Sequence, residues 1–287
     1  PASQAEVAGL LRALTGAGPV ETHISAVFVG PHDAFKLKKA LHLPFLDFST
    51  LAAREHFARR ELELNRPHAP GIYRDVVAVT RGADGALRLG GDGAPVEWLL
   101  RMAPVPAGDF LDAIAARGGL DEALLDAVAD AAASLLAEAP PAAGVDPAAR
   151  MAIVLEGNRL GCLEAGLDAA RVHAIAAAMQ ARLDALAPWM RARAKAGFVR
   201  RCHGDLHLQN FCLWQGRPVA FDALEFDEAL ARIDIGYEVA FLLMDIEVRA
   251  GRAAANRAMG RILARSGDVD AQRGLPFWMA QRALVRA

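Results

Sequence analysis

Residues 201–211, "RCHGDLHLQNF", place two His, an Asp, a Gln and an Asn between apolar side chains. So dense a polar run in an Ala- and Leu-rich chain is typical of a metal site, a catalytic loop or a well-bonded turn. Within it Asp205 and Asn210 lie five positions apart, and Asp222 ends the short segment "PVAFD". These three positions decide among the alternatives.

An Asp and an Asn that converge on one cation, beside a further carboxylate, suit phosphoryl transfer. That chemistry needs one carboxylate at the acceptor hydroxyl and magnesium held by hard oxygen ligands. The spacing D-x-x-x-x-N…D is that of kinase catalytic loops. Taken alone, His203 reads as a hydrogen-bonded loop residue. Zinc held by His203, Asp205 and His207 is the competing interpretation, but Asn210 and Asp222 favour a hard cation.

The composition indicates a globular protein with a sizeable core. The chain has 287 residues, 54% hydrophobic and 23% charged, with a net charge of −2, enough for one large domain or two lobes. Nothing in it indicates a nucleic-acid or membrane partner. Three cysteines without C-x-x-C spacing fit a reducing compartment. Because no apolar run is long enough to span a bilayer and no signal segment is seen, we expect a cytoplasmic location.

The pattern of the chain changes near Pro104–Pro106. Before it we expect helices at 4–14 and 50–66 and strands within 20–30, 33–39, 75–82, 86–90 and 95–104. After it we expect helices at 107–116, 120–138, 147–165, 168–196 and from 233 onward, interrupted by short strands and loops at 198–226. The sequence therefore predicts an α+β protein with a strand-rich lobe, 1–103, and a helical lobe, 104–287.

The segment 201–222 resembles the catalytic loop of the aminoglycoside phosphotransferase and choline kinase superfamily. Residues 20–75 and 200–247 look like a bacterial subgroup whose members are often fused to a C-terminal P-loop kinase-like domain. No G-x-x-x-x-G-K-[ST] motif occurs here, so we expect any such domain outside this sequence. The ending "FWMAQRALVRA" reads as the middle of an amphipathic helix, which favours a longer natural protein.

The resemblance implies a protein-kinase-like fold, with a small β-rich N-terminal lobe and a larger helical C-terminal lobe, that uses ATP or another nucleoside triphosphate with magnesium. It implies that Asp205 is the catalytic carboxylate that accepts or orients the acceptor hydroxyl. Asn210 and Asp222 would hold magnesium, and His203 would brace the loop. No fixed role carries over to His207.

The segment "AFKLKK" offers three lysines for the nucleotide phosphates. On a strand Lys36 and Lys38 share one face, so periodicity does not choose between them. The family pattern favours Lys36, and we expect Lys38 and Lys39 at a solvated edge.

The helix predicted at 50–66 supplies a carboxylate partner. Glu61 lies on the apolar stripe of Phe57 and Leu64, whereas Glu63 lies among arginines on a wet face. A buried carboxylate needs a partner. We therefore expect Glu61 to pair with Lys36, and Glu63 to remain at the surface.

The glycine-rich phosphate loop of kinases is missing. The equivalent turn, "ETHIS", offers only the hydroxyl and backbone N–H groups of Thr22 and Ser25, which leaves room for another nucleotide or for weak binding. The nucleotide base would meet backbone groups near Leu100 and Met102.

Residues 222–247 contain eight acidic side chains and one basic side chain. An acidic cleft would attract a cationic acceptor, and Glu225, Asp227 and Glu228 are the candidates for its lining. A solvated helix face explains the same surplus. Asp234 is a candidate structural carboxylate that bonds the catalytic loop.

We therefore expect an ATP- and magnesium-dependent phosphotransferase that acts on a hydroxyl of a small molecule. One rival is a pseudokinase that serves as a regulatory module for a P-loop domain, which the missing glycine loop favours. Another is a metal-dependent phosphohydrolase that uses His203, Asp205 and His207. The acceptor itself is not fixed by a fold.

Overall fold

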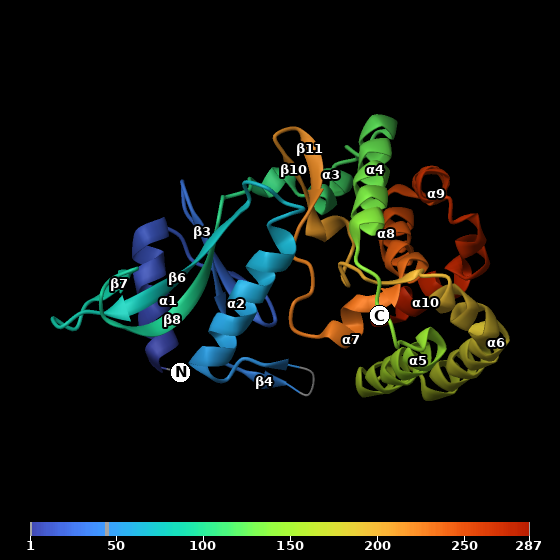
Figure 1. Cartoon of the computed structure of the whole chain (residues 1–287), viewed down its shortest axis with the longest axis horizontal. Helices are drawn as coiled ribbons and strands as arrows, with labels where there is room; N and C mark the ends of the chain where they lie inside the picture. Colours follow the sequence, from blue (N-terminus) through green and yellow to red (C-terminus); the bar gives the residue numbers. More distant parts are fainter. Residues whose placement is uncertain (1, 44–45, 287) are drawn as a thin grey trace. The chain divides into compact units, whose positions relative to one another are not determined.

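The structure is a computed structural model that describes residues 2–43 and 46–286. The chain divides into two compact units (Figure 1). The first unit holds the chain up to Ala107 together with Phe221–Asp227, and the second holds Gly108–Ala220 and the chain from Glu228 onward. The segment Phe221–Asp227 thus belongs to the first unit, although it lies within the range 104–287 that the sequence assigned to the helical lobe.

The first unit is built on a six-stranded sheet with the order β1-β2-β3-β8-β6-β7, in which every neighbouring pair is antiparallel. The strands are β1 (Val20–Glu21), β2 (Ser25–Val29), β3 (Ala34–Lys38), β6 (Tyr73–Arg81), β7 (Leu87–Leu89) and β8 (Ala94–Met102). A separate pair, β4 (His42–Leu43) and β5 (Leu46–Asp47), was not predicted.

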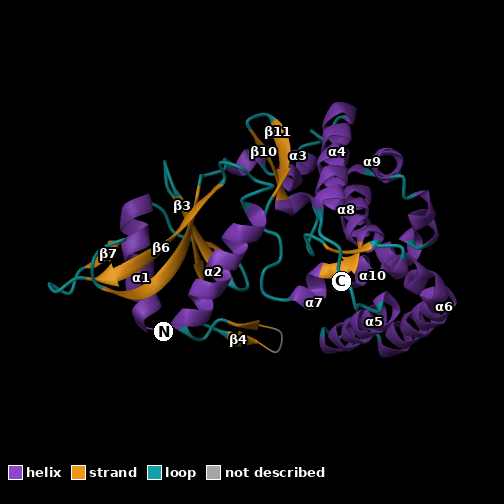
Figure 2. Cartoon of the chain, viewed as in Figure 1, coloured by secondary structure: helices purple, strands orange, loops and turns teal. Residues whose placement is uncertain are grey.

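Two helices, α1 (Ala2–Thr15) and α2 (Leu51–Asn65), cover the sheet (Figure 2). Side chains alternate along β3, so Phe35 and Leu37 enter one face and form a core with Val7 and Leu11 of α1. The lysines of β3 point to the opposite face, where α2 lies. α2 begins after Thr50, whose hydroxyl accepts a hydrogen bond from the third residue of the helix.

The second unit is mainly helical. Its helices are α3 (Leu111–Ala116), α4 (Glu122–Glu138), α5 (Pro147–Glu164), α6 (Ala169–Lys195), α7 (Glu228–Ala231), α8 (Ile235–Ala250), α9 (Arg252–Ser266) and α10 (Leu275–Val285). Helix α8 is buried on all sides from Ile235 to Ile246, so the other helices pack around it.

Short strands and 3₁₀ turns frame the loop that carries the central motif. β9 (Val199–Arg201) pairs antiparallel with β12 (Arg232–Asp234), and β10 (Phe211–Trp214) forms a hairpin with β11 (Arg217–Ala220). The 3₁₀ helices are η1 (Ala107–Asp109), η2 (Leu208–Asn210) and η3 (Val269–Arg273). The motif therefore lies between β9 and β10.

A buried arginine joins α6 to the start of α8 and to η3. Arg193 pairs with Asp234 at 2.8 Å and with Asp268 at 2.6 Å, and its guanidinium stacks near the rings of Trp189 and Trp278. Burial would lower the pKa of Arg193, but the hydrogen bonds and charges of the two carboxylates raise it. The guanidinium is therefore a fixed structural cation.

Asp234 is a structural carboxylate, but its partners differ from those that were predicted. It caps α8 by accepting the N–H of Gly236 at 2.8 Å, and its remaining bonds go to Arg193. Burial raises its pKa, against the effect of Arg193. The expectation that it bonds the catalytic loop is wrong, because its side chain lies at the end of β12 and faces α6.

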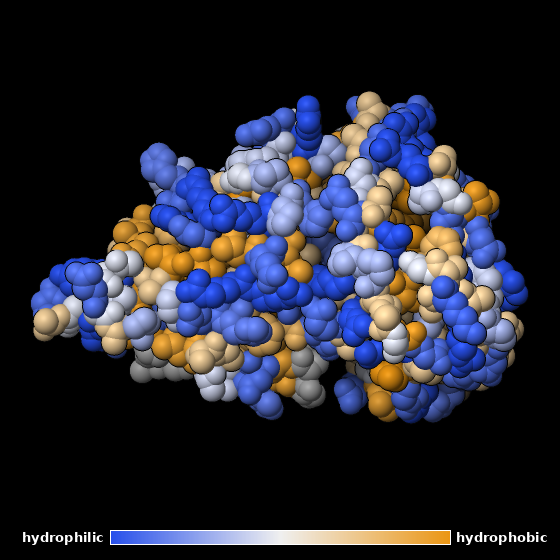
Figure 3. All heavy atoms as spheres, in the orientation of Figure 1, coloured by the Kyte–Doolittle hydropathy of each residue, from blue (hydrophilic) through white to orange (hydrophobic). Residues whose placement is uncertain are grey.

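Hydrophilic and apolar side chains are interspersed over the face drawn in Figure 3. None of the helices in residues 2–43 and 46–286 has the length and apolar character to cross a membrane.

Candidate functional site

Two buried lysines converge on one carboxylate in the first unit. Lys36 Nζ lies 2.8 Å from Glu61 Oε1, and Lys38 Nζ lies 2.6 Å from Glu61 Oε2. The predicted pair of Lys36 and Glu61 is present, but the expectation that Lys38 lies at a solvated edge is wrong. β3 lies between β2 and β8, so it is not an edge strand. On the face of the sheet where both lysines lie, they contact Glu61 of α2.

Lys36 also contacts Asp222, with Nζ 2.6 Å from Oδ1. Burial would lower the pKa of Lys36, but the charges of Asp222, Glu61 and Glu225 outweigh burial and raise it. The ammonium is therefore charged wherever the fold is intact. The Asp222 side chain is 39% exposed, so this carboxylate is also open to solvent.

Lys38 has a second partner in Glu225 and lies over the ring of Phe48, 5.0 Å from its centroid. Burial would lower the pKa of Lys38, but Glu61 and Glu225 raise it. Glu225 is 6% exposed. Because its carboxylate is buried and paired, Glu225 is not exposed to bind an acceptor, contrary to the expectation that it lines an acidic cleft.

The backbone around Asp222 is held on both sides. Asp222 has a left-handed φ of 63°, and its N–H donates to the Tyr73 hydroxyl at 2.9 Å. The next N–H, of Ala223, donates to Asn65 Oδ1 at 2.8 Å. The sequence reading missed Tyr73 and Asn65. Asn65 lies one helical turn after Glu61 on the same face of α2, which is the signal that was available.

The turn expected to replace the glycine loop closes on itself. The Thr22 N–H donates to the Ser25 carbonyl at 2.9 Å, and the Ser25 N–H donates to Thr22 Oγ1 at 2.9 Å. Ser25 is fully buried. The N–H groups of both residues are thus used within the turn, and so is the Thr22 hydroxyl, which also donates to the Ser25 carbonyl at 3.1 Å.

Leu100 and Met102 lie in β8, between β3 and β6. Both residues are in register with both neighbouring strands. Their side chains and backbone are thus part of the sheet, and the first residue past it, Ala103, donates its N–H to Ile72. A role in binding the base stays a prediction for this end of β8.

In the second unit Asn210 and His207 hold the side chain of Asp205. Asn210 Nδ2 donates to Asp205 Oδ2 at 3.0 Å and to its carbonyl at 2.8 Å, and His207 Nε2 lies 3.3 Å from Oδ2. Burial would raise the pKa of Asp205, but the hydrogen bond from His207 and the charges of His207, His203 and Arg282 lower it to about 2. Asp205 is therefore an ionised carboxylate in a fixed orientation.

The two histidines of the loop have different surroundings. His203 Nδ1 accepts the N–H of Asp205 at 3.4 Å, a bond that suits the bracing role which the resemblance implied. The ring of His207 packs on Phe241, with centroids 5.0 Å apart. Within the described residues its Nδ1 is buried and has no hydrogen-bond partner.

Two acidic side chains of α8 accept hydrogen bonds from backbone N–H groups of the loop. Glu238 Oε1 accepts the N–H of Gly204 at 2.9 Å, and Asp245 Oδ2 accepts the N–H of Leu208 at 3.0 Å. The sequence reading assigned neither residue. The signal was present, because these acids lie seven positions apart on one face of an otherwise apolar helix.

Glu238 is fully buried, and burial raises its pKa to about 7 against the opposing charge of Arg282. Arg282 Nη2 lies 3.7 Å from Glu238 Oε2, and the guanidinium stacks on Tyr237 and Phe241. Helix α10 therefore supports the same face of α8 that holds the loop.

The remaining acidic candidates are Asp227 and Glu228. Asp227 is half-buried at the end of the segment Phe221–Asp227. Glu228 begins α7, is 48% exposed and lies 3.3 Å from Arg201. Neither is buried as Glu225 is.

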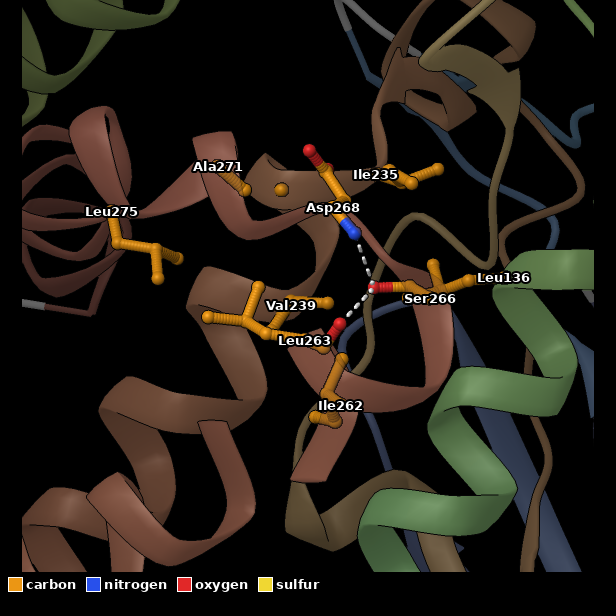
Figure 4. A pocket seen from close by; sticks show the side chains of 10 residues that line it. Leu136, Ile235, Val239, Ile262, Leu263, Ser266, Asp268, Ala271 and Leu275 are labelled. Atoms are coloured by element: carbon orange, nitrogen blue, oxygen red, sulfur yellow. Dashed lines mark hydrogen bonds between the residues drawn. The ribbon is translucent and has the colours of Figure 1, made fainter. Parts of the chain in front are cut away.

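A small cavity in the second unit lies apart from the loop (Figure 4). Ile235 and Val239 of α8 line it, and the Ser266 hydroxyl accepts the N–H of Asp268 beside it. Glu238 and Asp245 lie on a different face of α8. The cavity is mostly apolar and is not part of the candidate site.

The residues fit a hard cation and a phosphate group. In the second unit Asn210 uses its amide nitrogen on Asp205, so its oxygen remains. In the first unit Asp222 offers a carboxylate, and each of these is a ligand type that magnesium accepts. In the first unit three carboxylates face two ammonium groups, which leaves one negative charge for a cation. These groups are Lys36, Lys38, Glu61, Asp222 and Glu225, and we call them the lysine–carboxylate cluster.

The alternative of a zinc-type centre finds no support in the geometry. Across residues 2–43 and 46–286, no group of three or more His, Cys, Asp and Glu side chains is arranged to hold a metal ion. The set His203, Asp205 and His207 is used instead for bonds within the loop.

The curated proteins that this chain resembles are longer than the chain, and the match covers only part of each of them. No family model matches the chain. Uncharacterized proteins of Mycobacterium tuberculosis and Mycobacterium bovis are 27% identical over 277 residues, which covers 93% of this chain and 53% of each relative. The chain thus spans about half the length of the curated relatives it matches.

Comparison with solved structures shows the fold. Choline kinase from Cryptosporidium parvum Iowa II is similar with a TM-score of 0.56 and 10% identity, over 98% of this chain and 87% of that chain. An aminoglycoside-3'-phosphotransferase of type VIII (17% identity, TM-score 0.49, 97% and 99% covered) and a glucosamine kinase (20%, 0.47, 99% and 80%) are also similar. The similarity to choline kinase confirms the kinase-like α+β fold that the resemblance implied; at 10% identity it shows the fold alone.

Proposed function

We propose that the chain is an ATP- and magnesium-dependent phosphotransferase that acts on a hydroxyl of a small molecule. The observation that carries this proposal is the buried Lys36, paired with Glu61 of α2 on one side and with Asp222 on the other. In kinases a strand lysine is held by a helix carboxylate, and a separate Asp binds the metal. A lysine with a purely structural role would not need a partner such as Asp222, whose carboxylate is partly exposed to solvent.

Lys36 would bind phosphate oxygens, and Asn210 and Asp222 would hold magnesium. When bound, magnesium supplies charge neutralisation for the transferred phosphoryl group. The raised pKa of Lys36 supports this role, because the ammonium keeps its charge for a phosphate.

Asp205 would orient the acceptor hydroxyl and take its proton late. A carboxylate with a pKa of about 2 is a weak base, so it does not remove a proton before the phosphoryl group has moved. Its fixed geometry, held by Asn210 and His207, supports positioning as its larger contribution.

The acceptor is proposed as a small alcohol, and the case for a cationic one is narrower than the sequence suggested. Of the eight acids in 222–247, four are buried in structural bonds, namely Glu225, Asp234, Glu238 and Asp245. With Asp222 assigned to magnesium, three remain, namely Asp227, Glu228 and Glu247, and of these Glu228 pairs with Arg201 and Glu247 with Arg252. An aminoglycoside-like or choline-like amine is therefore one acceptor class among several.

A screen of phosphate acceptors with labelled ATP and magnesium tests the proposal. Amines, sugars and peptides are offered to the wild-type protein and to Asp205→Asn. We expect transfer to at least one small alcohol that disappears in the variant. Transfer that is equal in the two proteins would assign the activity to a contaminant and defeat the proposal.

A second candidate is a nucleotide-binding pseudokinase that regulates a P-loop kinase domain. The turn Thr22–Ser25 favours it, because the N–H groups that would hold phosphates bond within the turn. A thermal-shift titration with nucleotide, with and without magnesium, separates the two. Stabilisation without transfer to any acceptor would favour the pseudokinase.

A further inference from the structure

The segment Phe221–Asp227 is fastened to three elements of the first unit. Asp222 donates its N–H to Tyr73 of β6, and Ala223 donates its N–H to Asn65 of α2. Glu225 pairs with Lys38 of β3. Each contact uses a different element, so the segment is fixed in position as well as in orientation.

These contacts hold Asp222 in a left-handed conformation, with a φ of 63°. This conformation is unfavourable for a residue with a side chain and persists where the surroundings hold it. The two backbone bonds hold the amides of Asp222 and Ala223, and Glu225 closes the segment three residues on. The Asp222 carboxylate is thereby kept 2.6 Å from Lys36.

Lys38 is unlike an ordinary surface lysine in this arrangement. Its side chain is 2% exposed, and its ammonium lies between the carboxylates of Glu61 and Glu225. Lys38 therefore links α2 to the segment by donating a charged hydrogen bond to each of the two carboxylates. Because Lys38 occupies one oxygen of Glu61, that carboxylate keeps a partner when Lys36 turns to a ligand.

We propose that Lys38 and Glu225 are a positioning pair that holds the segment Phe221–Asp227, and with it the Asp222 carboxylate, against the sheet and α2. The anchoring stands on the contacts of the first unit. Its consequence for catalysis rests on the proposed function. Neither residue touches the reacting groups in this proposal, so both act through Asp222.

Hydrogen–deuterium exchange of the ligand-free protein tests the anchoring. The variants are Glu225→Gln, which keeps the size of the side chain, and Lys38→Met. Lys39→Met is the matched control, since Lys39 is the next residue and pairs with Glu21 near the surface. We expect peptides from 221–227 to exchange at least ~10-fold faster in both test variants, with the second unit unchanged.

The magnesium requirement tests the catalytic consequence. In Glu225→Gln we expect the magnesium concentration for half-maximal activity to rise about tenfold, with kcat at saturating magnesium within about threefold of wild type. A merely structural defect lowers the active fraction and hence kcat, without moving the magnesium requirement. Partial rescue is expected in the Lys38→Met/Glu225→Gln double variant, which should lose less than the sum of the two.

Three outcomes would overturn the proposal: unchanged exchange at 221–227, faster exchange spread evenly over all peptides, or local loosening with an unmoved magnesium requirement. If Lys38→Met does not fold, Glu225→Gln decides. If the wild-type protein neither binds nucleotide with magnesium nor transfers phosphate, the proposed function fails. In that case the exchange experiment still decides whether the pair anchors the segment.

Discussion

Lys38 and Glu61 form an ion pair of 2.6 Å in which both side chains are buried. The other oxygen of the same carboxylate binds a second lysine, so Glu61 is the centre of a charge network and not one half of a single pair. A lysine buried between carboxylates cannot be exchanged for a neutral side chain without leaving a charge in the core.

We therefore expect Lys38→Met to lower the free energy of unfolding by about 3–5 kcal/mol, because it strands Glu61 and Glu225. Lys39→Met should change it by only about 0–1 kcal/mol, since that lysine is partly exposed and its partner Glu21 is largely exposed. Urea unfolding of the two variants beside wild type measures both. Equal effects of the two substitutions would show that the burial of Lys38 contributes nothing.

Lys36 and Glu61 should be coupled in nucleotide use. Lys36→Ala and Glu61→Ala are each expected to weaken ATP use, because each leaves a poorly solvated charge. The double variant should lose less than the sum of the two. Glu63→Ala is the control and should be nearly silent, since Glu63 is 69% exposed and pairs with Arg60 at the surface. Strict additivity of kcat/KM across the cycle would argue against the pairing.

Much of the lysine–carboxylate cluster was predictable from the local sequence pattern. The helical stripe of α2 turned Glu61 inward, and strand alternation placed Lys36 and Lys38 on one face. What the pattern could not supply was the order of the strands. The position of β3 between β2 and β8 depends on long-range pairing and removes Lys38 from the sheet edge. The segment Phe221–Asp227, which is far away in the sequence, brings Glu225 to it.

The motif of the second unit was predictable as a spacing but not as a supported structure. Asp205 and Asn210 contact each other, as the five-residue spacing allowed. Their support comes from Glu238 and Asp245, which were read only as part of an acidic surplus. A count of charges along the chain does not distinguish an acid that faces solvent from one that accepts a buried N–H.

Asp222→Ala should remove magnesium-dependent nucleotide binding more than Asn210→Ala does. A carboxylate gives a full charge to a hard cation, whereas an amide gives only a dipole. Calorimetric titration of nucleotide with and without magnesium measures the difference. If the Asp222 variant kept the magnesium dependence of wild type, that residue would not be a ligand.

Asp205→Asn should lower kcat at least ~100-fold, by the usual contribution of a positioned base, and leave the Tm close to that of wild type. Because the pKa of Asp205 is about 2, the carboxylate is ionised at every pH at which the protein is assayed. The wild-type rate should therefore show no decline assignable to Asp205 between about pH 5 and 8. A decline in kcat centred within that range and absent in the variant would contradict the assignment.

Glu238 should make the stability of the fold depend on pH. Burial raises its pKa from the usual 4.5 to about 7, so between these values the folded protein holds a proton that the unfolded chain has lost. The free energy of unfolding should therefore fall as pH rises from about 4.5 to about 7, by an amount on the order of a few kcal/mol.

Glu238→Gln should remove this part of the pH dependence, because the amide still accepts the Gly204 N–H but does not titrate. Glu63→Gln, on the exposed side of α2, is the control and should keep the wild-type slope. Urea unfolding at several pH values between 4.5 and 8 provides the measurement. If Glu238→Gln kept the wild-type slope, the carboxylate would not be protonated in the fold. The bond to Gly204 would then be that of a charged acceptor, and Arg282 would have to approach closer than the 3.7 Å seen here to compensate it.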